Sequence, residues 1–365
     1  MEAQEDNFNY IEFWQENEWC LKNFDKKTRI PITLNFDDHF LQELVGPFST
    51  IEYYNNHQYK IDIHKKANEI LYENLGKRFY SEETDIEPYP VRFEILMGAN
   101  YKITEGSTPW FESEVENIDD VKRLIERYHK FDLKNEIFKD NLLQRKEEYE
   151  KKTNKKVSWG HFTRGPATLA TSIIGTTNLC IFMMEEEDVI NEFYEIMGEK
   201  LVEYLKLIRE ASGNFSNSIA LLDDDCFLFS PSLYDKFCAP VLEKLFNTFA
   251  PNKDDRRFQH SDSDMAHLMP ILYRLGVNAV NFGPNIHPLE IRRTMPNARI
   301  HGQIPPFVLR NGTREEIIDI VKRDMEVALI DGNFIATTAG SVAAGTPMEN
   351  IKTFIKAVYE FGKIA

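Results

Sequence analysis

The chain contains 365 residues, of which 42% are hydrophobic and 12% aromatic, and its formal net charge is −16. A chain of this length and apolar content can bury a large core, which excludes extensive disorder. The negative charge argues against nucleic acid as a partner, because such binding depends on clustered Lys and Arg side chains that neutralise phosphates.

The sequence predicts no association with a membrane. The N-terminal stretch MEAQEDNFNYIEFW is acidic and lacks the apolar core of a secretion signal. The run from Gly165 to Met184 is uncharged and long enough to cross a bilayer, but it contains Pro, Gly, Thr, Asn and Ser. We expect this run to form a buried loop and helix of a soluble, cytoplasmic protein. The four cysteines lack a CxxC pair and do not form a disulfide framework.

Three segments precede the region in which the pattern becomes regular. Residues 1–80 are predicted to be mainly helical, with one candidate strand at RIPITLNF, residues 29–36. Prolines and glycines interrupt the helical periodicity of residues 81–106, so short strands and turns are expected there. Residues 117–156 are strongly charged and predict helices with a solvated face. We expect a helical extension over residues 1–80 and a main domain over residues 81–365.

From residue 157 onward, short apolar runs end in polar residues, and a helix follows each run. The runs are SIALLDDD, RRFQHS, VNAVNFGP, ARIHGQIP and NFIATTAG. Two of the helices are predicted to begin with capping boxes, formed by Thr313 with Glu316 and by Thr346 with Glu349. The repeated order of strand, polar end and helix predicts a parallel sheet, either closed or doubly wound. Since no GxGxxG or Walker loop favours the open sheet, we expect an α/β fold, namely a (β/α)8 TIM barrel.

Polar residues gather where the predicted strands end, which is the face of a (β/α)8 barrel that carries its chemistry. In chain order they are His161, Arg164, Asp223, Asp224, Asp225, His260, Asp262, Asn281, Asn285, His301, Gln303, Thr337 and Thr338. Carboxylates beside imidazoles suit a divalent metal such as zinc, or general acid–base catalysis. Helix capping is the alternative role for any single aspartate.

Residue spacing limits which of these side chains can share one site. His260 and Asp262 are two residues apart and are therefore expected on the same side of a strand. Successive strand residues point to opposite sides, so three adjacent aspartates cannot all point at one centre. We expect either Asp224 alone, or Asp223 together with Asp225, to face the site.

Five stretches of the chain together resemble the uroporphyrinogen decarboxylase superfamily, a group of (β/α)8 barrels that also contains corrinoid-dependent methyltransferases. They are GHFTRGPATLATSIIG, DDDCFLFSPSLYDKFCAPVLEKL, FQHSDSDMAHLMPILYRLGVNAVNFGP, ARIHGQIPPFVLRNGTREEI and GSVAAGTPMENIKTFIKAVYEFG. The N-terminal stretch GPFSTIEYY is similar to methyltransferase I of O-demethylase systems, which act on methoxylated aromatic compounds. Decarboxylases of the superfamily carry an arginine-rich substrate loop, whereas this chain has the acidic PITLNFDDHFLQEL in that place.

The resemblance implies a zinc site, and two ligand patterns of the family can be compared with this chain. Thiol-methylating members carry His-x-Cys and a distant Cys, where this chain has His260, Asp262 and Ser341. This difference argues against a thiolate acceptor of the coenzyme M type. Aryl-ether members carry Glu, Glu and His, which fall here on Asp224, Ala239 and His260. The resemblance thus implies that Asp224, His260 and Asp262 hold zinc or supply a proton, with Asp262 in place of the missing ligand.

The resemblance also implies four substrate-binding residues, which are His161, Asn281, Gln303 and Phe227. The first hypothesis is a methyltransferase that moves a methyl group from a methoxylated aromatic substrate to the cob(I)alamin of a separate corrinoid protein, giving methylcobalamin. The second is a decarboxylase-like lyase acting on a smaller carboxylic acid, and the third is a non-catalytic barrel with a decayed metal site. The methyl donor, zinc binding and assembly into a homodimer stay open at this stage.

Overall fold

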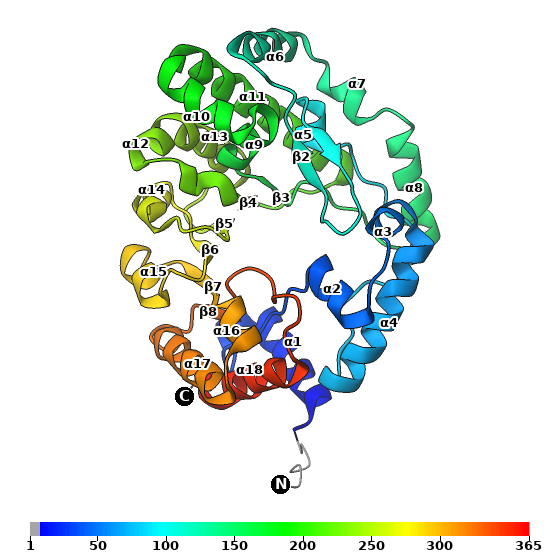
Figure 1. Cartoon of the computed structure of the whole chain (residues 1–365), viewed down its shortest axis with the longest axis vertical. Helices are drawn as coiled ribbons and strands as arrows, with labels where there is room; N and C mark the ends of the chain where they lie inside the picture. Colours follow the sequence, from blue (N-terminus) through cyan, green and yellow to red (C-terminus); the bar gives the residue numbers. More distant parts are fainter. Residues whose placement is uncertain (1–7, 365) are drawn as a thin grey trace. The chain divides into compact units, whose positions relative to one another are not determined.

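The computed structural model describes residues 8–364, and the chain divides into two compact units (Figure 1). The first unit combines Met1–Thr84 with Asn281–Ala365, and the second comprises Asp85–Val280. Strands β3 to β8 follow one another in chain order and are parallel wherever a register is given. The fold is therefore of the α/β class that the strand–helix pattern predicted.

The second unit holds most of the helices. Before the parallel strands it contains α5 (Phe93–Leu96), β1 (Asn100–Lys102), β2 (Trp110–Glu112), α6 (Ile118–Lys130), α7 (Leu133–Ile137) and α8 (Leu142–Thr153). Its strands and helices continue with β3 (Phe162–Arg164), α9 (Pro166–Ile174), α10 (Thr176–Glu185), α11 (Glu187–Ser212), β4 (Ser218–Leu222), η2 (Asp224–Leu228), α12 (Pro231–Leu233), η3 (Tyr234–Cys238), α13 (Ala239–Phe249), β5 (Arg256–Ser261), η4 (Ala266–Leu268) and α14 (Met269–Arg274). The helices predicted in residues 117–156 are confirmed as α6, α7 and α8.

Pairing of β3, β4 and β5 places three residues in one row near the ends of these strands. Leu222, the last residue of β4, lies opposite Arg164 of β3 on one side and His260 of β5 on the other. Parallel strands end at the same edge of a sheet, and residues in register point to the same face. The side chains of this row therefore share one face, close to where the chain leaves the sheet.

Asp223 joins the end of β4 to helix α9. Its carboxylate accepts a hydrogen bond from the Thr168 N–H at 2.9 Å and another from the Tyr234 hydroxyl at 3.3 Å. The Asp223 side chain packs closely against the backbone of Gly165, since a Cβ at Gly165 would lie 2.2 Å from Asp223 Cγ. The Gly165 φ of −73° suits any residue, so glycine is needed here for space and not for its backbone freedom.

The uncharged run at residues 165–184 forms two helices, α9 and α10. Helix α9 is buried along its whole length, whereas α10 buries only Leu179 and Met183. The predicted buried helix is thus confirmed, but a second helix replaces the expected loop. Among the described residues, no single helix is long and apolar enough to cross a membrane. Only α9 and α10 taken together have that length and composition, and they are bent by 102°.

The first unit contains the N-terminal helices and the last two parallel strands. Its N-terminal part has α1 (Tyr10–Lys22), η1 (Phe24–Lys26), α2 (Asp38–Val45), α3 (Thr50–Asn55) and α4 (His57–Leu75). Its C-terminal part has α15 (Pro288–Thr294), β7 (Arg299–Ile304), α16 (Pro306–Asn311), α17 (Arg314–Ala328), β8 (Phe334–Thr338) and α18 (Met348–Phe361). Strand β6 (Ala279–Phe282) contains the boundary between the units. Within the unit, β7 pairs with β8, and α17 packs on α18.

The strand predicted at residues 29–36 is present as isolated bridges. Ile32 pairs in parallel with Ala336 of β8, and Phe36 pairs with Val342. The Ala336 N–H donates to the Pro31 carbonyl at 2.8 Å, but Pro31 has no N–H of its own to extend the ladder. This segment therefore pairs with β8 within the first unit, while the division of the chain at residue 80 stays a prediction.

One of the two predicted capping boxes is confirmed and the other is wrong. Thr313 and Glu316 form the reciprocal box at the start of α17. Helix α18 instead begins after Pro347, which has no N–H for a glutamate to accept from. The Thr346 hydroxyl donates to the Ala343 carbonyl at 2.7 Å. Because the helix starts one residue later than predicted, Glu349 occupies its second position and cannot close a box.

Replacing Gly165 with Ala should lower the free energy of unfolding by about 1–3 kcal/mol, because the added methyl group would overlap the Asp223 carboxylate. Urea unfolding of the two proteins measures this difference. In an Asp223→Gly background the same substitution should cost less, since the overlapping atoms are gone. An equal cost in both backgrounds would show that the contact with Asp223 is not the cause.

Burial raises the pKa of Asp223 to about 6 from 3.8, although hydrogen bonds from Thr168 and Tyr234 oppose the shift. Between these values the folded protein binds the proton more tightly than the unfolded chain does. The stability that Asp223 contributes is thus fully present below pH 4 and is lost as the pH rises through 6. Relative to Asp223→Asn, wild-type stability should fall by about 2–3 kcal/mol between pH 4 and 7, measured by urea unfolding of metal-free protein. A difference that does not change with pH would contradict the assignment.

Candidate active site

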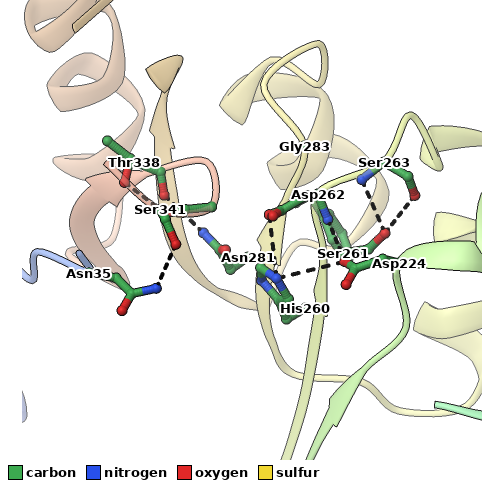
Figure 2. Close-up of polar contacts among 12 residues, drawn as sticks. Asn35, Asp224, His260, Ser261, Asp262, Ser263, Asn281, Gly283, Thr338 and Ser341 are labelled. Atoms are coloured by element: carbon green, nitrogen blue, oxygen red, sulfur yellow. Dashed lines mark hydrogen bonds and ion pairs between the residues drawn. The ribbon is translucent and has the colours of Figure 1, made fainter. Parts of the chain in front are cut away.

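Asp224, His260 and Asp262 converge at the C-terminal ends of β4 and β5 (Figure 2). His260 Nε2 lies 3.7 Å from Asp224 Oδ1 and 3.3 Å from Asp262 Oδ1. The Asp262 backbone N–H donates to Asp224 Oδ1 at 2.9 Å, which fixes the two carboxylates relative to each other. One ligand atom from each residue lies within 4.8 Å of the others. A single ion can therefore contact all three side chains.

The donor set of this cluster fits zinc. It offers one imidazole nitrogen and two carboxylate oxygens, and three protein ligands beside an open position are the pattern of catalytic zinc sites. Ligands of a tetrahedral zinc ion lie about 3.3–3.6 Å apart when the bonds are 2.0–2.2 Å long, close to the two distances from His260. The Asp224 and Asp262 side chains are about half exposed, so a substrate can reach the cluster.

The three adjacent aspartates serve three different purposes. Asp223 is fully buried against α9. Asp225 accepts a hydrogen bond from the Thr171 hydroxyl at 2.5 Å, and its N–H donates to Thr168 at 3.1 Å. Only Asp224 faces His260. Both neighbours of Asp224 therefore hold α9 against the strand end, which fixes the backbone from which Asp224 projects.

A cavity of about 390 Å³ lies within the second unit and shares Asp224 with the cluster. Four aromatic residues line it, namely Tyr89, Phe93, Phe162 and Tyr204, together with Leu222 of the row described above. The volume falls near the lower end of the roughly 300–1,000 Å³ that small-molecule sites occupy. Its aromatic lining beside a polar cluster suits a small, flat ligand.

A charged group forms one side of this cavity. Glu94 is 5% exposed, and its Oε1 accepts a hydrogen bond from Arg92 Nη2 at 3.2 Å and forms an ion pair with Arg164 Nε at 3.1 Å. Arg164 Nη1 also donates to the Ser172 hydroxyl at 3.2 Å. Burial lowers the pKa of Arg164, but a guanidinium stays charged in proteins. Arg164 stood among the predicted strand ends, whereas nothing in the sequence pointed to Arg92 or Glu94.

Two of the predicted substrate-binding residues lie in the second unit, outside the cavity lining. His161 precedes β3, and its ring contacts Ser158 at 2.8 Å and Asn214 at 3.4 Å. The strand end expected at His161 is therefore misplaced, because β3 begins one residue later and ends at Arg164. Phe227 lies in η2 with 46% of its surface exposed. For both residues, substrate binding stays a prediction.

The other two predicted substrate-binding residues belong to the first unit and bind backbone groups there. Asn281 Nδ2 donates to the carbonyls of His301 at 2.5 Å and Thr338 at 3.2 Å. Gln303 is buried, and its Nε2 donates to the carbonyls of Phe282 at 2.9 Å and Gly283 at 2.6 Å. These bonds hold neighbouring segments of the unit together, and a role toward substrate stays a prediction.

The other positions in the family's ligand patterns are Ala239 and Ser341, and neither side chain is an imidazole, a thiol or a carboxylate. Ala239 lies in α13 and is buried. Ser341 belongs to the first unit, where its hydroxyl accepts from Asn35 Nδ2 at 2.9 Å. Cys226 is buried, with Sγ 3.6 Å from the Ser261 hydroxyl, and burial raises the pKa of its thiol. Cys238 is buried as well, and both thiols are free, so these two cysteines serve as packing residues.

The sequence matches the family described as Uroporphyrinogen decarboxylase (URO-D) over residues 94–361. A uroporphyrinogen decarboxylase of Prochlorococcus marinus (strain MIT 9515) is 23% identical over 275 residues, which are 73% of this chain and 75% of that protein. The methylcobamide:CoM methyltransferase MtaA of Methanosarcina barkeri (strain Fusaro) is 24% identical over 202 residues, 54% of this chain and 56% of the relative.

A solved structure has the same fold. The structure described as a methyltransferase from Methanosarcina mazei superposes with a TM-score of 0.60 and 17% sequence identity, covering 91% of this chain and 94% of the other. The predicted barrel fold and the resemblance to the superfamily are thereby confirmed. The chain belongs to the uroporphyrinogen decarboxylase family, and its relatives include a methylcobamide:CoM methyltransferase.

Proposed function

We propose that this protein is a methyltransferase that transfers a methyl group from a small O-methylated aromatic compound to the cob(I)alamin of a separate corrinoid protein. The convergence of Asp224, His260 and Asp262 beside an aromatic-lined cavity carries this proposal. The similarity to methyltransferases that act on methylcobamides or methylated thiols supports the class of reaction.

The chemistry of an aryl methyl ether requires a group of this kind. The methyl carbon is a poor electrophile because the phenolate oxygen leaves badly, so charge on that oxygen must be stabilised as the bond breaks. Zinc bound by the cluster would supply a Lewis acid at this oxygen. Without zinc, His260 between the two carboxylates would instead supply a proton to this oxygen, because its Nε2 cannot both coordinate the metal and carry a proton.

The cluster suits an ether oxygen better than a thiolate. Its three donors are nitrogen and oxygen, and none is a cysteine. The nearby Cys226 is buried, and its raised thiol pKa keeps it protonated, whereas thiolates are the form that binds metals. The arrangement therefore favours an O-methylated donor over the thiol chemistry of the MtaA relatives.

A lyase acting on a small carboxylic acid is the second candidate. The similarity to decarboxylases extends over 275 residues, more of the chain than the similarity to MtaA covers. A lyase of this type would release carbon dioxide without any corrinoid. The non-catalytic alternative is weaker, because a decayed site gives no reason for three donors to converge.

Purified protein should contain about one zinc ion per chain, and His260→Ala should lose it, because the variant removes the only nitrogen donor of the cluster. Elemental analysis after gel filtration measures this. His129→Ala is the matched control, since His129 is exposed on α6 and lies outside the cluster. If His260→Ala left the zinc content unchanged, the metal would be bound elsewhere. If the wild-type protein took up no zinc, supplying a proton would be the remaining role of the cluster.

Asp224→Asn should lower kcat/KM for demethylation by roughly 10²- to 10³-fold, the effect of losing one group that stabilises charge on a departing oxygen. The assay follows the conversion of free cob(I)alamin to methylcobalamin by absorbance, with methoxybenzoates as donors. Asp319→Asn is the control, because Asp319 is exposed on α17. Carbon dioxide release without cob(I)alamin, and no methyl transfer with it, would replace this proposal with the lyase.

A further inference from the structure

We infer that the methyl donor is an aromatic carboxylate, whose carboxylate group is bound by Arg92 and Arg164 in the cavity of the second unit. This inference rests on the proposed function, since it names the class of its substrate. It also concerns a feature that the metal cluster does not use. The two arginines and Glu94 line the same cavity as Asp224.

The charges of Arg92, Arg164 and Glu94 do not cancel. Two guanidinium groups share one carboxylate oxygen of Glu94, so these three residues carry one excess positive charge, which Asp224 and Asp225 offset in part at Arg164. Glu94 is buried, while the Arg92 and Arg164 side chains are 47% and 30% exposed. The carboxylate therefore lies behind the two guanidinium groups, and the excess positive charge lies on their exposed side. An anion in the cavity would complete the pairing.

Some N–H groups of the two guanidinium groups are available to a ligand. Arg92 donates from Nη2 to Glu94 and Arg164 donates from Nη1 to Ser172, while Arg164 Nε forms an ion pair with Glu94. Arg92 Nη1 and Arg164 Nη2 make no hydrogen bond to any residue that the structure describes. Paired guanidinium N–H groups match the two oxygens of a carboxylate, and such charge-assisted bonds are strong.

Phe111 of β2 holds the two arginines in place. The guanidinium carbon of Arg92 lies 4.8 Å from the centre of the Phe111 ring, and that of Arg164 lies 5.0 Å from it. Contact with a ring face restrains a guanidinium without consuming its N–H donors. Together with Glu94, this ring fixes the position of the arginines before a ligand arrives, which lowers the entropic cost of binding.

The spacing between the arginines and the metal cluster fits one aromatic ring. Arg164, Leu222 and His260 occupy one row across three neighbouring strands. Strands lie about 4.8 Å apart, so the two outer residues of the row are separated by roughly 9–10 Å. Leu222, between them, lines the cavity. A ring lying over Leu222 can direct its carboxylate toward Arg164 and a methoxy oxygen toward Asp224 and His260.

Binding of para-methoxybenzoate and of the neutral para-methoxybenzamide tests this inference, by calorimetry without corrinoid. Wild-type protein should bind the carboxylate at least tenfold more tightly than the amide. Arg92→Gln and Arg164→Gln should each weaken carboxylate binding by roughly 10- to 100-fold and leave amide binding unchanged. Arg145→Gln is the control with the same change of charge, because Arg145 is exposed on α8.

Equal binding of the two ligands by wild-type protein, or binding of neither, would overturn the inference. This comparison needs no substitution, so it remains decisive even if Arg164→Gln does not fold. Equal losses in Arg145→Gln and the two cavity variants would also overturn it. Methyl transfer from the amide but not the carboxylate would leave the proposed function standing and refute the anion site. Carboxylate-selective binding without any methyl transfer would support the anion site and refute the proposed function.

Discussion

The in-register pairing of β3, β4 and β5 is the constraint on which the site depends. It places Arg164, Leu222 and His260 side by side at the edge where the strands end. Each residue then leads to a different part of the site: a guanidinium pair, an apolar surface and the cluster that we propose binds a metal. A slip of one residue by any one of these strands would turn its member of the row to the opposite face and separate that part from the others.

The buried carboxylate of Asp223 supports the site from behind. It connects the end of β4 to α9 and Tyr234, at the cost of holding an ionisable group away from water. Because Asp223 and Asp225 are both occupied by α9, the chain between them has a fixed direction. Asp224 thereby projects toward His260, and the Asp262 N–H, which donates to its Oδ1 at 2.9 Å, orients the carboxylate. The contacts of Asp223 and Asp225 with α9 therefore support the site from behind.

The sequence predicted what depends on local pattern and missed what depends on distant contacts. Apolar runs ending in polar residues identified β4 to β8, and the two-residue spacing of His260 and Asp262 put them in one cluster. His161 was wrongly placed at the end of β3, because the strand begins one residue after it and ends at Arg164, the other residue predicted there. Arg92 and Glu94 could not be predicted as site residues. Glu94 lies 70 residues before Arg164 in the sequence, and only folding brings the two side chains together.

We propose that Asp224, His260 and Asp262 bind one metal ion through nitrogen and oxygen alone. X-ray absorption at the zinc edge of the loaded protein tests it most directly. We expect nitrogen and oxygen ligands at about 2.0–2.2 Å with no sulfur, and loss of the imidazole contribution in His260→Ala. A sulfur shell near 2.3 Å, or a spectrum that His260→Ala leaves unchanged, would contradict it.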